Sequence, residues 1–526
     1  MVIYDQVIPS HSTGVLGYLA LGVGIALCIE MAFRLFRAKV IAYLGGRIEN
    51  LVANATFGKI LNLPPNLTES ASVGAQAARL REFDSIRDVF TGPLVSVGLE
   101  LPFAGLFIAV IALIGGKLAF IPVVMMALYA LLGFLILPKL KRHVKASARA
   151  RAERHSFLVE MLISARTIKQ LASETIWLDR YRDLSARASL AHFKTAQLSF
   201  ILQTLAQSIM MGAGIATIGF GVLFVIDGAM TMGALIATMA LVWRVLSPLQ
   251  GLFLALTRLE QIKLSFKQIN QLMSMPDESH EKHYRLQRRF LGDVAFDRIS
   301  FRYRVDAEPA LLGLSFSVAA GQSLAIMGKN GSGKTTILNL LMALYRPQAG
   351  IVTIDGVDIR QIDPVELRQT IAYVPQDIQL FHGTIAQNLR LGEPTASDED
   401  LRKVCADVGV LDQIMALPDG FATRIGDQKL QQLNYGFRQS IAIARALLRH
   451  SPIILLDEAA RSLDYDADKA FIALLQKLKG KATVIMVSHR PSHIKLCDYA
   501  LVLDGGVARG MGKADEVLAA LDGGLL

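Results

Sequence analysis

One eight-residue stretch, Gly328-Lys329-Asn330-Gly331-Ser332-Gly333-Lys334-Thr335, constrains the fold of this chain more than any other. It matches G-x-x-x-x-G-K-[ST], and the apolar runs on both sides predict a strand, a tight loop and a helix. Glycines let backbone N–H groups close around phosphates, and the helix N-terminus adds a favourable dipole. We therefore expect a nucleotide site. Its predicted binding residues are Gly328, Asn330, Gly331, Ser332, Gly333, Lys334, Thr335 and Thr336.

Within this stretch, Lys334 is expected to reach the outer phosphates and the Thr335 hydroxyl to bind Mg²⁺. A glycine turn of this kind also occurs by chance, so the downstream motifs decide between the two interpretations. A buried run ends in Asp457 and Glu458. Asp457 is placed to hold Mg²⁺ through water, and Glu458 to polarise the attacking water. An ordinary exposed acidic pair is a poor explanation once the glycine loop lies upstream.

The length and the distribution of apolar residues indicate two parts. At 526 residues the chain is too long for one ordinary domain, and 52% of its residues are hydrophobic, most of them crowded into the first half. The net charge of +10 comes from Lys and Arg that lie mostly beside apolar runs, as membrane topology requires, so we expect no nucleic-acid partner. The three cysteines are scattered and predict neither disulfides nor a metal site.

Five apolar runs predict membrane spans at about 14–33, 93–115, 118–137, 200–225 and 230–253. The two long connections between them are basic and the short ones are not, so the long ones face the cytoplasm and the N-terminus lies outside. The first run has its positive residues after it rather than before it, which favours a span over a cleavable signal. Several runs approach twenty residues, which excludes buried helices of a soluble protein.

The second half alternates predicted strands with helical runs. The strands are expected at 294–303, 314–318, 323–327, 351–354, 371–374, 453–456, 483–487 and 500–503. This alternation indicates an α/β nucleotide-binding domain. The predicted fold is therefore an α-helical transmembrane domain over 1–275, a linker over 276–292 and an α/β P-loop domain over 293–526.

Taken together, these motifs resemble those of the ABC transporter ATPases over the whole second half. The resemblance implies ATP and Mg²⁺ as cofactors and assigns four more residues. It implies that Gln376 (in Tyr-Val-Pro-Gln) is the Q-loop residue that links Mg²⁺ to the membrane half, and that His489 (in Ser-His-Arg) is the switch histidine on the γ-phosphate. Asp464 corresponds to the D-loop aspartate and Tyr303 to the aromatic that stacks on adenine. For Tyr303, a core aromatic on the first strand is the alternative.

One family motif is altered. The signature L-S-G-G-Q aligns with Leu433-Asn434-Tyr435-Gly436-Phe437, where Ser, the first Gly and Gln are replaced. In the family this stretch caps the γ-phosphate held by the other subunit's P-loop, and glycine lets backbone N–H groups come close. Tyr435 adds a bulky side chain there, although Asn434 still suits an N-cap. The preceding loop at 426–429 lacks its usual second glycine and is one residue longer.

The membrane half resembles the type I secretion permease–ATPases, through residues 73–83, 85–88, 231–237 and 244–249. Two departures stand out. No peptidase or peptidase-like domain precedes the spans, and residues 4–9 resemble the stretch after the first of six family spans. The first family span is therefore expected to be missing, through a misassigned start, a decayed gene or a helix supplied by a partner.

The resemblance implies half of an ATP-driven exporter of a protein or peptide in the bacterial inner membrane. It also implies a periplasmic adaptor, an outer-membrane channel and surrounding membrane lipid as partners. A heterodimer with a second half-transporter is expected, because an unaltered partner signature would then complete the site of Lys334 and Glu458. The alternatives are a homodimer, a non-hydrolysing or truncated subunit with a regulatory role, and a small-molecule or lipid exporter on the same fold.

Two charges fall inside predicted spans. Glu100 and Arg244 lie at a similar distance from the outer ends of their spans. Charges at such depth usually face the bundle interior and pair, so one interpretation is a Glu100–Arg244 pair in a ring of polar groups along the substrate path. The other, which the extension of the spans past the bilayer favours, is that each side chain extends separately towards cytoplasmic water.

Overall fold

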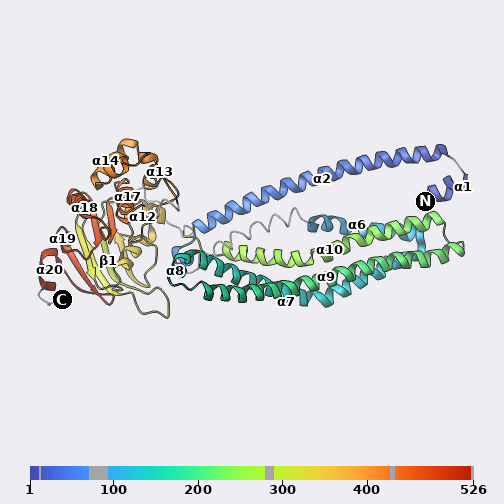
Figure 1. Ribbon diagram of the computed structural model, residues 1–526, viewed down its shortest axis with the longest axis horizontal. Coiled ribbons are helices and arrows are strands. Elements are labelled where there is room, and N and C mark those ends of the chain that lie inside the picture. Colours follow the sequence, from blue (N-terminus) through green and yellow to red (C-terminus); the bar gives the residue numbers. More distant parts are fainter. Residues whose placement is uncertain (11–12, 70–92, 279–288, 427–432, 523–526) are drawn as a thin grey trace. The chain divides into compact units, whose positions relative to one another are not determined.

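The computed structural model describes residues 1–10, 13–69, 93–278, 289–426 and 433–522 (Figure 1). It divides into two compact units, one of Met1–Leu63 and Glu69–Met275, the other of Pro64–Thr68 and Pro276–Leu526. Most of the predicted linker, the family-like stretches at 73–83 and 85–88, and most of the loop at 426–429 lie outside the described residues.

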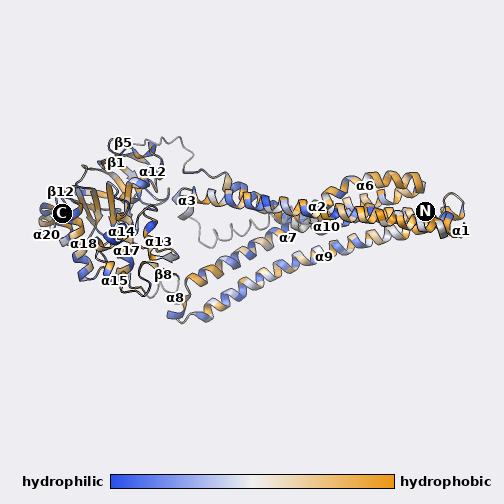
Figure 2. Cartoon of the chain, turned by 90° about the horizontal axis from the view of Figure 1, so that it is seen from above, coloured by the Kyte–Doolittle hydropathy of each residue, from blue (hydrophilic) through white to orange (hydrophobic). Residues whose placement is uncertain are grey.

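The first unit consists of helices. Their bounds are η1 Ile3–Val7, α1 Ile8–Ser10, α2 Thr13–Leu61, α6 Pro93–Gly115, η2 Gly116–Ala119, α7 Phe120–Ile163, α8 Ala165–Gln170, α9 Glu174–Ile226 and α10 Met232–Met273. Hydrophobic residues concentrate in the halves of α7 and α9 far from α8, and hydrophilic residues in the halves near it (Figure 2).

Within the described residues, four continuous helical runs are long and apolar enough to cross a membrane: Gly14–Leu61, Val97–Ile163, Glu174–Ile226 and Met232–Phe253. All five predicted apolar stretches fall largely within these runs, because Val97–Ile163 contains most of α6, the turn η2 and α7. Four of the helices, α2, α7, α9 and α10, extend well past the predicted spans. An apolar run marks only the lipid-facing length of a helix, and the polar continuation of that helix carries no such signal.

Small residues allow the helices of this unit to pack closely. A Cβ added at Gly115, Gly214 or Gly221 would lie 2.8 Å from Thr238, 3.2 Å from Trp243 and 2.1 Å from Leu235, respectively. Close approach over small residues is the usual way in which helices associate within a membrane. The core of this bundle includes Ile111, Leu140, Leu202 and Val242, all with at most 2% of their surface exposed.

The N-terminal segment is anchored to the start of α10 by Asp5. The Asp5 carboxylate accepts hydrogen bonds from the Thr231 hydroxyl at 2.8 Å and from the backbone N–H of Gly233 at 2.9 Å. The Thr231 hydroxyl in turn accepts from the N–H of Ala234. A carboxylate at a helix N-terminus interacts favourably with the helix dipole, so Asp5 stabilises the first turn of α10.

The predicted pair of Glu100 and Arg244 is wrong. Glu100 lies 3.5 Å from Arg37, and Arg244 lies 4.0 Å from Glu30, so both charges face α2 rather than each other. The physical reason is that α2 brings charges of both signs close to them, including Arg34, which contacts Glu30 one turn away. The sequence shows the depth of a charge but not which neighbouring helix lies beside it.

The second unit is an α/β domain. Its strands are β1 Val294–Phe301, β2 Leu311–Val318, β3 Ser323–Gly328, β4 Ala349–Ile354, β5 Val357–Asp358, β6 Ile371–Val374, β7 Gly383–Thr384, β8 Arg424–Ile425, β9 Ile453–Asp457, β10 Thr483–Val487, β11 Tyr499–Asp504 and β12 Val507–Lys513. Among the described residues they form sheets ordered β2-β1-β4-β5, β12-β11-β3-β10-β9-β6 and β7-β8. From β11 to β6 the central sheet is parallel.

The helices of this unit are α3 Pro65–Glu69, most of which belongs to it, α11 Lys334–Leu341, η3 Ile359–Gln361, α12 Pro364–Thr370, α13 Ile385–Arg390, α14 Asp398–Val408, α15 Leu411–Met415, η4 Gly420–Ala422, α17 Tyr435–Leu447, α18 Tyr465–Leu478, α19 Pro491–Ile494 and α20 Ala514–Asp522.

Successive residues of β3 face opposite cores. Ala325 and Met327 pack with α14, α17 and α18, whereas Leu324 and Ile326 pack with α11 and the antiparallel sheet. Because both faces of the central strands are buried, their sequences are continuous apolar runs. The predicted fold class is confirmed.

The observed ion pairs lead to a prediction for the helical unit. Glu100→Arg should place two cations side by side and lower the free energy of unfolding by about 1 kcal/mol, and adding Arg37→Glu should restore most of it. Thermal unfolding of the purified chain measures this. Arg151→Glu, on the exposed face of α7, is the control. Rescue of Glu100→Arg by Arg244→Glu instead would show that the pairing is wrong.

Candidate nucleotide-binding site

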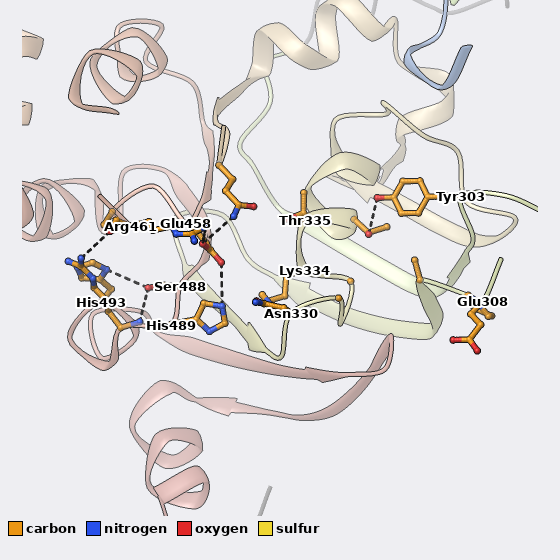
Figure 3. Close-up of a pocket in the computed structure, with 18 residues that line it drawn as sticks. Tyr303, Glu308, Asn330, Lys334, Thr335, Glu458, Arg461, Ser488, His489 and His493 are labelled. Carbon is orange, nitrogen blue, oxygen red and sulfur yellow. Dashed lines mark hydrogen bonds and ion pairs between the residues drawn. The ribbon is translucent and has the colours of Figure 1, made fainter. Parts of the chain in front are cut away.

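A cavity of about 820 Å³ collects most of the predicted site residues (Figure 3). The P-loop follows β3, Gln376 follows β6, Glu458 follows β9 and His489 follows β10. Because these strands are parallel, their carboxyl ends meet at one edge of the sheet, where α/β proteins bind ligands. The predicted residues that line the cavity are Tyr303, Asn330, Gly331, Gly333, Lys334, Thr335, Thr336, Gln376, Glu458 and His489.

The glycines of the P-loop are required by its geometry. Gly328 has a φ of 145°, and a Cβ there would lie 2.2 Å from the carbonyl oxygen of Leu503. Gly333 has a φ of 101°, and its Cβ would lie 2.5 Å from the carbonyl oxygen of Ala310. Only a residue without a side chain fits at either place, so the loop follows the tight path that a phosphate cradle needs.

Lys334 begins α11 and reaches back across the loop. Its ammonium donates to the carbonyl oxygens of Gly328 and Lys329, each at 2.8 Å. Burial lowers the pKa of Lys334, and the nearby carboxylates of Glu458 and Asp457 partly offset this effect. The cation is therefore held on the inner side of the loop, where it faces the acidic residues of the cavity.

Asp457 fits the role of a residue that holds a divalent cation. Its side chain is 1% exposed, and both of its oxygens lack a partner with hydrogen-bond geometry. Burial raises the pKa of this carboxyl, and the Thr335 hydroxyl and the Lys334 ammonium oppose the rise. A buried carboxylate with unsatisfied oxygens suits Mg²⁺. Within the described residues no group of three or more His, Cys, Asp or Glu residues could hold a metal.

Glu458 holds an uncommon backbone conformation, with a φ of 48°. Its N–H donates to the carbonyl oxygen of Val487 at 3.1 Å, and its own carbonyl accepts from the side-chain amide of Gln439 at 3.3 Å. For a residue other than glycine, this left-handed backbone conformation costs about 1–3 kcal/mol and persists only where the surrounding structure enforces it. Neighbouring elements therefore fix the direction of the Glu458 side chain.

The Glu458 carboxylate is the meeting point of three side chains. Gln376 Nε2 lies 3.4 Å from Oε2, Arg461 Nη1 lies 3.5 Å from the same oxygen, and His489 Nε2 lies 3.4 Å from Oε1 (Figure 3). The structure thus brings Glu458, Gln376 and His489 together, as the sequence predicted. Their catalytic roles stay predictions.

Tyr303 lies two residues beyond the end of β1 and lines the cavity. Its hydroxyl is 3.0 Å from the hydroxyl of Thr336, and its ring makes edge contacts with Phe301 and Tyr345. With 48% of its surface exposed, it is not a buried core aromatic. Stacking on adenine stays a prediction that this placement allows.

The altered signature begins α17. Asn434 is its N-cap, since its side-chain oxygen accepts from the N–H of Phe437 at 2.6 Å, which confirms that role. The Tyr435 side chain folds back onto its own domain, where its hydroxyl donates to the carbonyl oxygen of Gln376 at 3.0 Å. A Cβ at Gly436 would lie 2.9 Å from the carbonyl oxygen of Ser462, so this retained glycine packs against the D-loop. The D-loop residue Asp464 caps α18.

Sequence reasoning missed several residues around the cavity. Arg461 contributes a cation beside Glu458, and its position three residues after Glu458 was the available signal. His493 is 1% exposed and lies 3.0 Å from Asp468, which also accepts from Arg490 at 2.6 Å. Burial lowers the pKa of His493, and Asp468 opposes that effect. No spacing rule in the sequence pointed to this network, because its members come from two distant helices.

Two P-loop glycines give a prediction about stability. In Gly331→Ala the added Cβ has no atom within 4 Å. The substitution should therefore lower the free energy of unfolding only through the strain of a left-handed backbone, by about 1–2 kcal/mol. Gly333→Ala carries the same strain plus a clash with a backbone carbonyl, and should cost about 1–3 kcal/mol more. Thermal unfolding of the nucleotide domain without nucleotide measures the difference. Equal losses would show that the loop can rearrange around a side chain.

Comparison with known proteins covers nearly the whole chain. Residues 2–249 match the family described as ABC transporter transmembrane region, and residues 311–461 match the family described as ABC transporter. The chain is 31% identical over 517 residues to the leukotoxin translocation ATP-binding protein LktB of Mannheimia glucosida, and 31% identical over 518 residues to the alpha-hemolysin translocation ATP-binding protein HlyB of Escherichia coli. Each alignment spans 98% of this chain and 73% of the relative.

Among solved structures, a bacterial Atm1-family ABC exporter with ATP bound matches with a TM-score of 0.84 and 25% identity, over 98% of this chain and 92% of that one. Both the helical bundle and the nucleotide domain are included in a match of that extent. The chain therefore belongs to the ABC transporter family, as an inner-membrane protein with an exporter-type helical region and a cytoplasmic ATP-binding domain.

Proposed function

We propose that this chain is one half of an ATP-driven exporter that carries a protein or peptide across the inner membrane. The observation that carries the proposal is the alignment over 98% of the chain, membrane half included, with two proteins named for the translocation of protein toxins. The site geometry supports the energetic part, since residues of the P-loop, Glu458 and the switch histidine His489 line one cavity.

Each side chain of the cavity has a proposed task. Lys334 would bind the outer phosphates of ATP, and Thr335, Gln376 and Asp457 would hold Mg²⁺. Bound there, Mg²⁺ would neutralise charge on the phosphates. Glu458 takes up the proton of the attacking water and His489 donates to the γ-phosphate.

The proposed assembly is a heterodimer with a second half-transporter, working with a periplasmic adaptor and an outer-membrane channel. The chain keeps every catalytic residue but has lost three signature positions. In a heterodimer its own Lys334 and Glu458 meet an unaltered partner signature, so one site is competent. A homodimer would place Asn434, Tyr435 and Phe437 at both sites.

Two other functions have an observation in their favour. The altered signature favours a non-hydrolysing subunit with a regulatory role, which would bind ATP without turnover. The Atm1-family match at a TM-score of 0.84 favours a small-molecule exporter on the same fold. Stimulation of ATP turnover separates these: an unfolded protein substrate should stimulate a protein exporter, a small molecule should stimulate the other exporter, and neither should stimulate a non-hydrolysing subunit.

Substitutions at two residues test the ATP chemistry. Lys334→Ala should abolish nucleotide binding, because Lys334 contacts phosphate in the ground state. Glu458→Gln should keep binding and reduce hydrolysis at least a hundredfold, because Glu458 acts on the attacking water. Fluorescent-nucleotide binding and phosphate release measure the two effects. Lys403→Ala and Glu516→Gln, both exposed on outer helices, are matched controls. Unchanged turnover in Glu458→Gln would refute its assigned role.

Restoring the signature tests the heterodimer. Donors to the γ-phosphate are worth about 3–4 kcal/mol, or several hundredfold in rate. The triple change Asn434→Ser, Tyr435→Gly and Phe437→Gln should therefore raise ATP turnover strongly in a homodimer, but act only at the partner's site in a heterodimer. Phosphate release is compared for the chain purified alone and for the co-purified complex. Turnover by the unmodified chain alone that equals that of the complex would contradict a heterodimer.

A further inference from the structure

Tyr435 makes a contact that a glycine at this signature position has no atoms to make. Its phenolic hydroxyl donates to the main-chain oxygen of Gln376 at 3.0 Å, across 59 residues of sequence. Its ring lies against the guanidinium of Arg438, 5.0 Å from the ring centroid. The ring is held by the cation at one side and the hydroxyl by the carbonyl at its end, so the side chain has a defined direction.

The residue that Tyr435 contacts is also the residue that contacts Glu458. The Gln376 side-chain amide donates to the Glu458 carboxylate at 3.4 Å. Main-chain oxygen and side chain of Gln376 share one Cα, so a hydrogen bond that fixes the carbonyl also limits where the amide can lie. The Tyr435 hydroxyl thus acts on the nucleotide cavity through one intervening residue.

The same helix reaches Glu458 at a second point. Gln439, four residues after Tyr435 on α17, is 1% exposed and donates from its side-chain amide to the Glu458 carbonyl at 3.3 Å. Residues four apart lie on one face of a helix. One face of α17 therefore contacts the main chain of both residues whose side chains meet in the cavity.

We propose that Tyr435 is a positioning residue for ATP hydrolysis in its own subunit, where its hydroxyl holds Gln376 in register with Glu458. This rests on the proposed ATP hydrolysis at Glu458. The altered signature then has a function within its own subunit. The Tyr435 side chain, at a position where the family has glycine, connects the first turn of α17 to the Q-loop. Nucleotide binding at Lys334 does not depend on this contact.

The first test needs no activity. In the full-length chain, Tyr435→Phe removes the hydroxyl and keeps the ring on Arg438. Amide hydrogen exchange around residues 376–380 should become about fivefold faster, because a hydrogen bond that restrains the Q-loop is lost. Tyr499→Phe, at the opposite end of the central sheet, is the matched control and should leave this segment unchanged. Unchanged exchange in Tyr435→Phe would overturn the proposal.

The second test is a double-mutant cycle on ATP turnover. Tyr435→Phe should lower kcat about fivefold and leave the affinity for ATP unchanged. In a Gln376→Ala background the same change should have no further effect, because the hydroxyl acts only through the Gln376 side chain. An equal drop in both backgrounds would show a merely structural role and overturn the proposal. Absence of turnover in the unmodified complex would instead refute the proposed function, and hydrogen exchange would still decide the role of Tyr435.

Discussion

The Glu458 carboxylate lies at the end of a buried parallel strand, in a backbone conformation with a φ of 48° that its neighbours must enforce. Its main chain is bound by Val487 and Gln439, and its side chain by Gln376, Arg461 and His489. Three segments distant in sequence, around Gln376, Gln439 and Val487–His489, therefore converge on one residue. The three contacts of the carboxylate itself are 3.4–3.5 Å long, near the limit of hydrogen-bond length, so a small shift of any of these side chains changes how the carboxylate is held. This arrangement makes hydrolysis sensitive to the geometry of the whole domain.

The central strands and the phosphate loop were predictable because local sequence determines them. Burial on both faces gives the continuous apolar runs of β3, β9 and β10, and the loop needs glycine wherever a Cβ would meet backbone. The short strands β5, β7 and β8 and the glycine-containing β12 carry no such pattern and were missed. The His493–Asp468 contact depends on tertiary neighbours, and the same limit explains why Glu100 was assigned the wrong partner, whereas Arg461 had a local signal in its position three residues after Glu458.

The altered signature has a different meaning after its geometry is known. Sequence alone made Tyr435 an obstacle to the partner's phosphate, whereas the structure turns its side chain towards Gln376 of the same chain. Asn434 keeps the helix capped and Gly436 still packs closely on the D-loop. The stretch thus retains the architecture of a signature while one substituted side chain gains a contact inside its own subunit. In the heterodimer that we propose, the altered signature in trans and the Tyr435 contact in cis would make the two ATP sites unequal.

The central claim is that the site of Lys334 and Glu458 hydrolyses ATP in the assembled transporter. Vanadate trapping with a photoreactive ATP analogue tests it directly, because vanadate retains the nucleoside diphosphate only at a site that has completed a turnover. The account predicts vanadate-dependent labelling of this chain, at a peptide near Tyr303. Labelling confined to a partner chain, with this chain labelled only independently of vanadate, would contradict it.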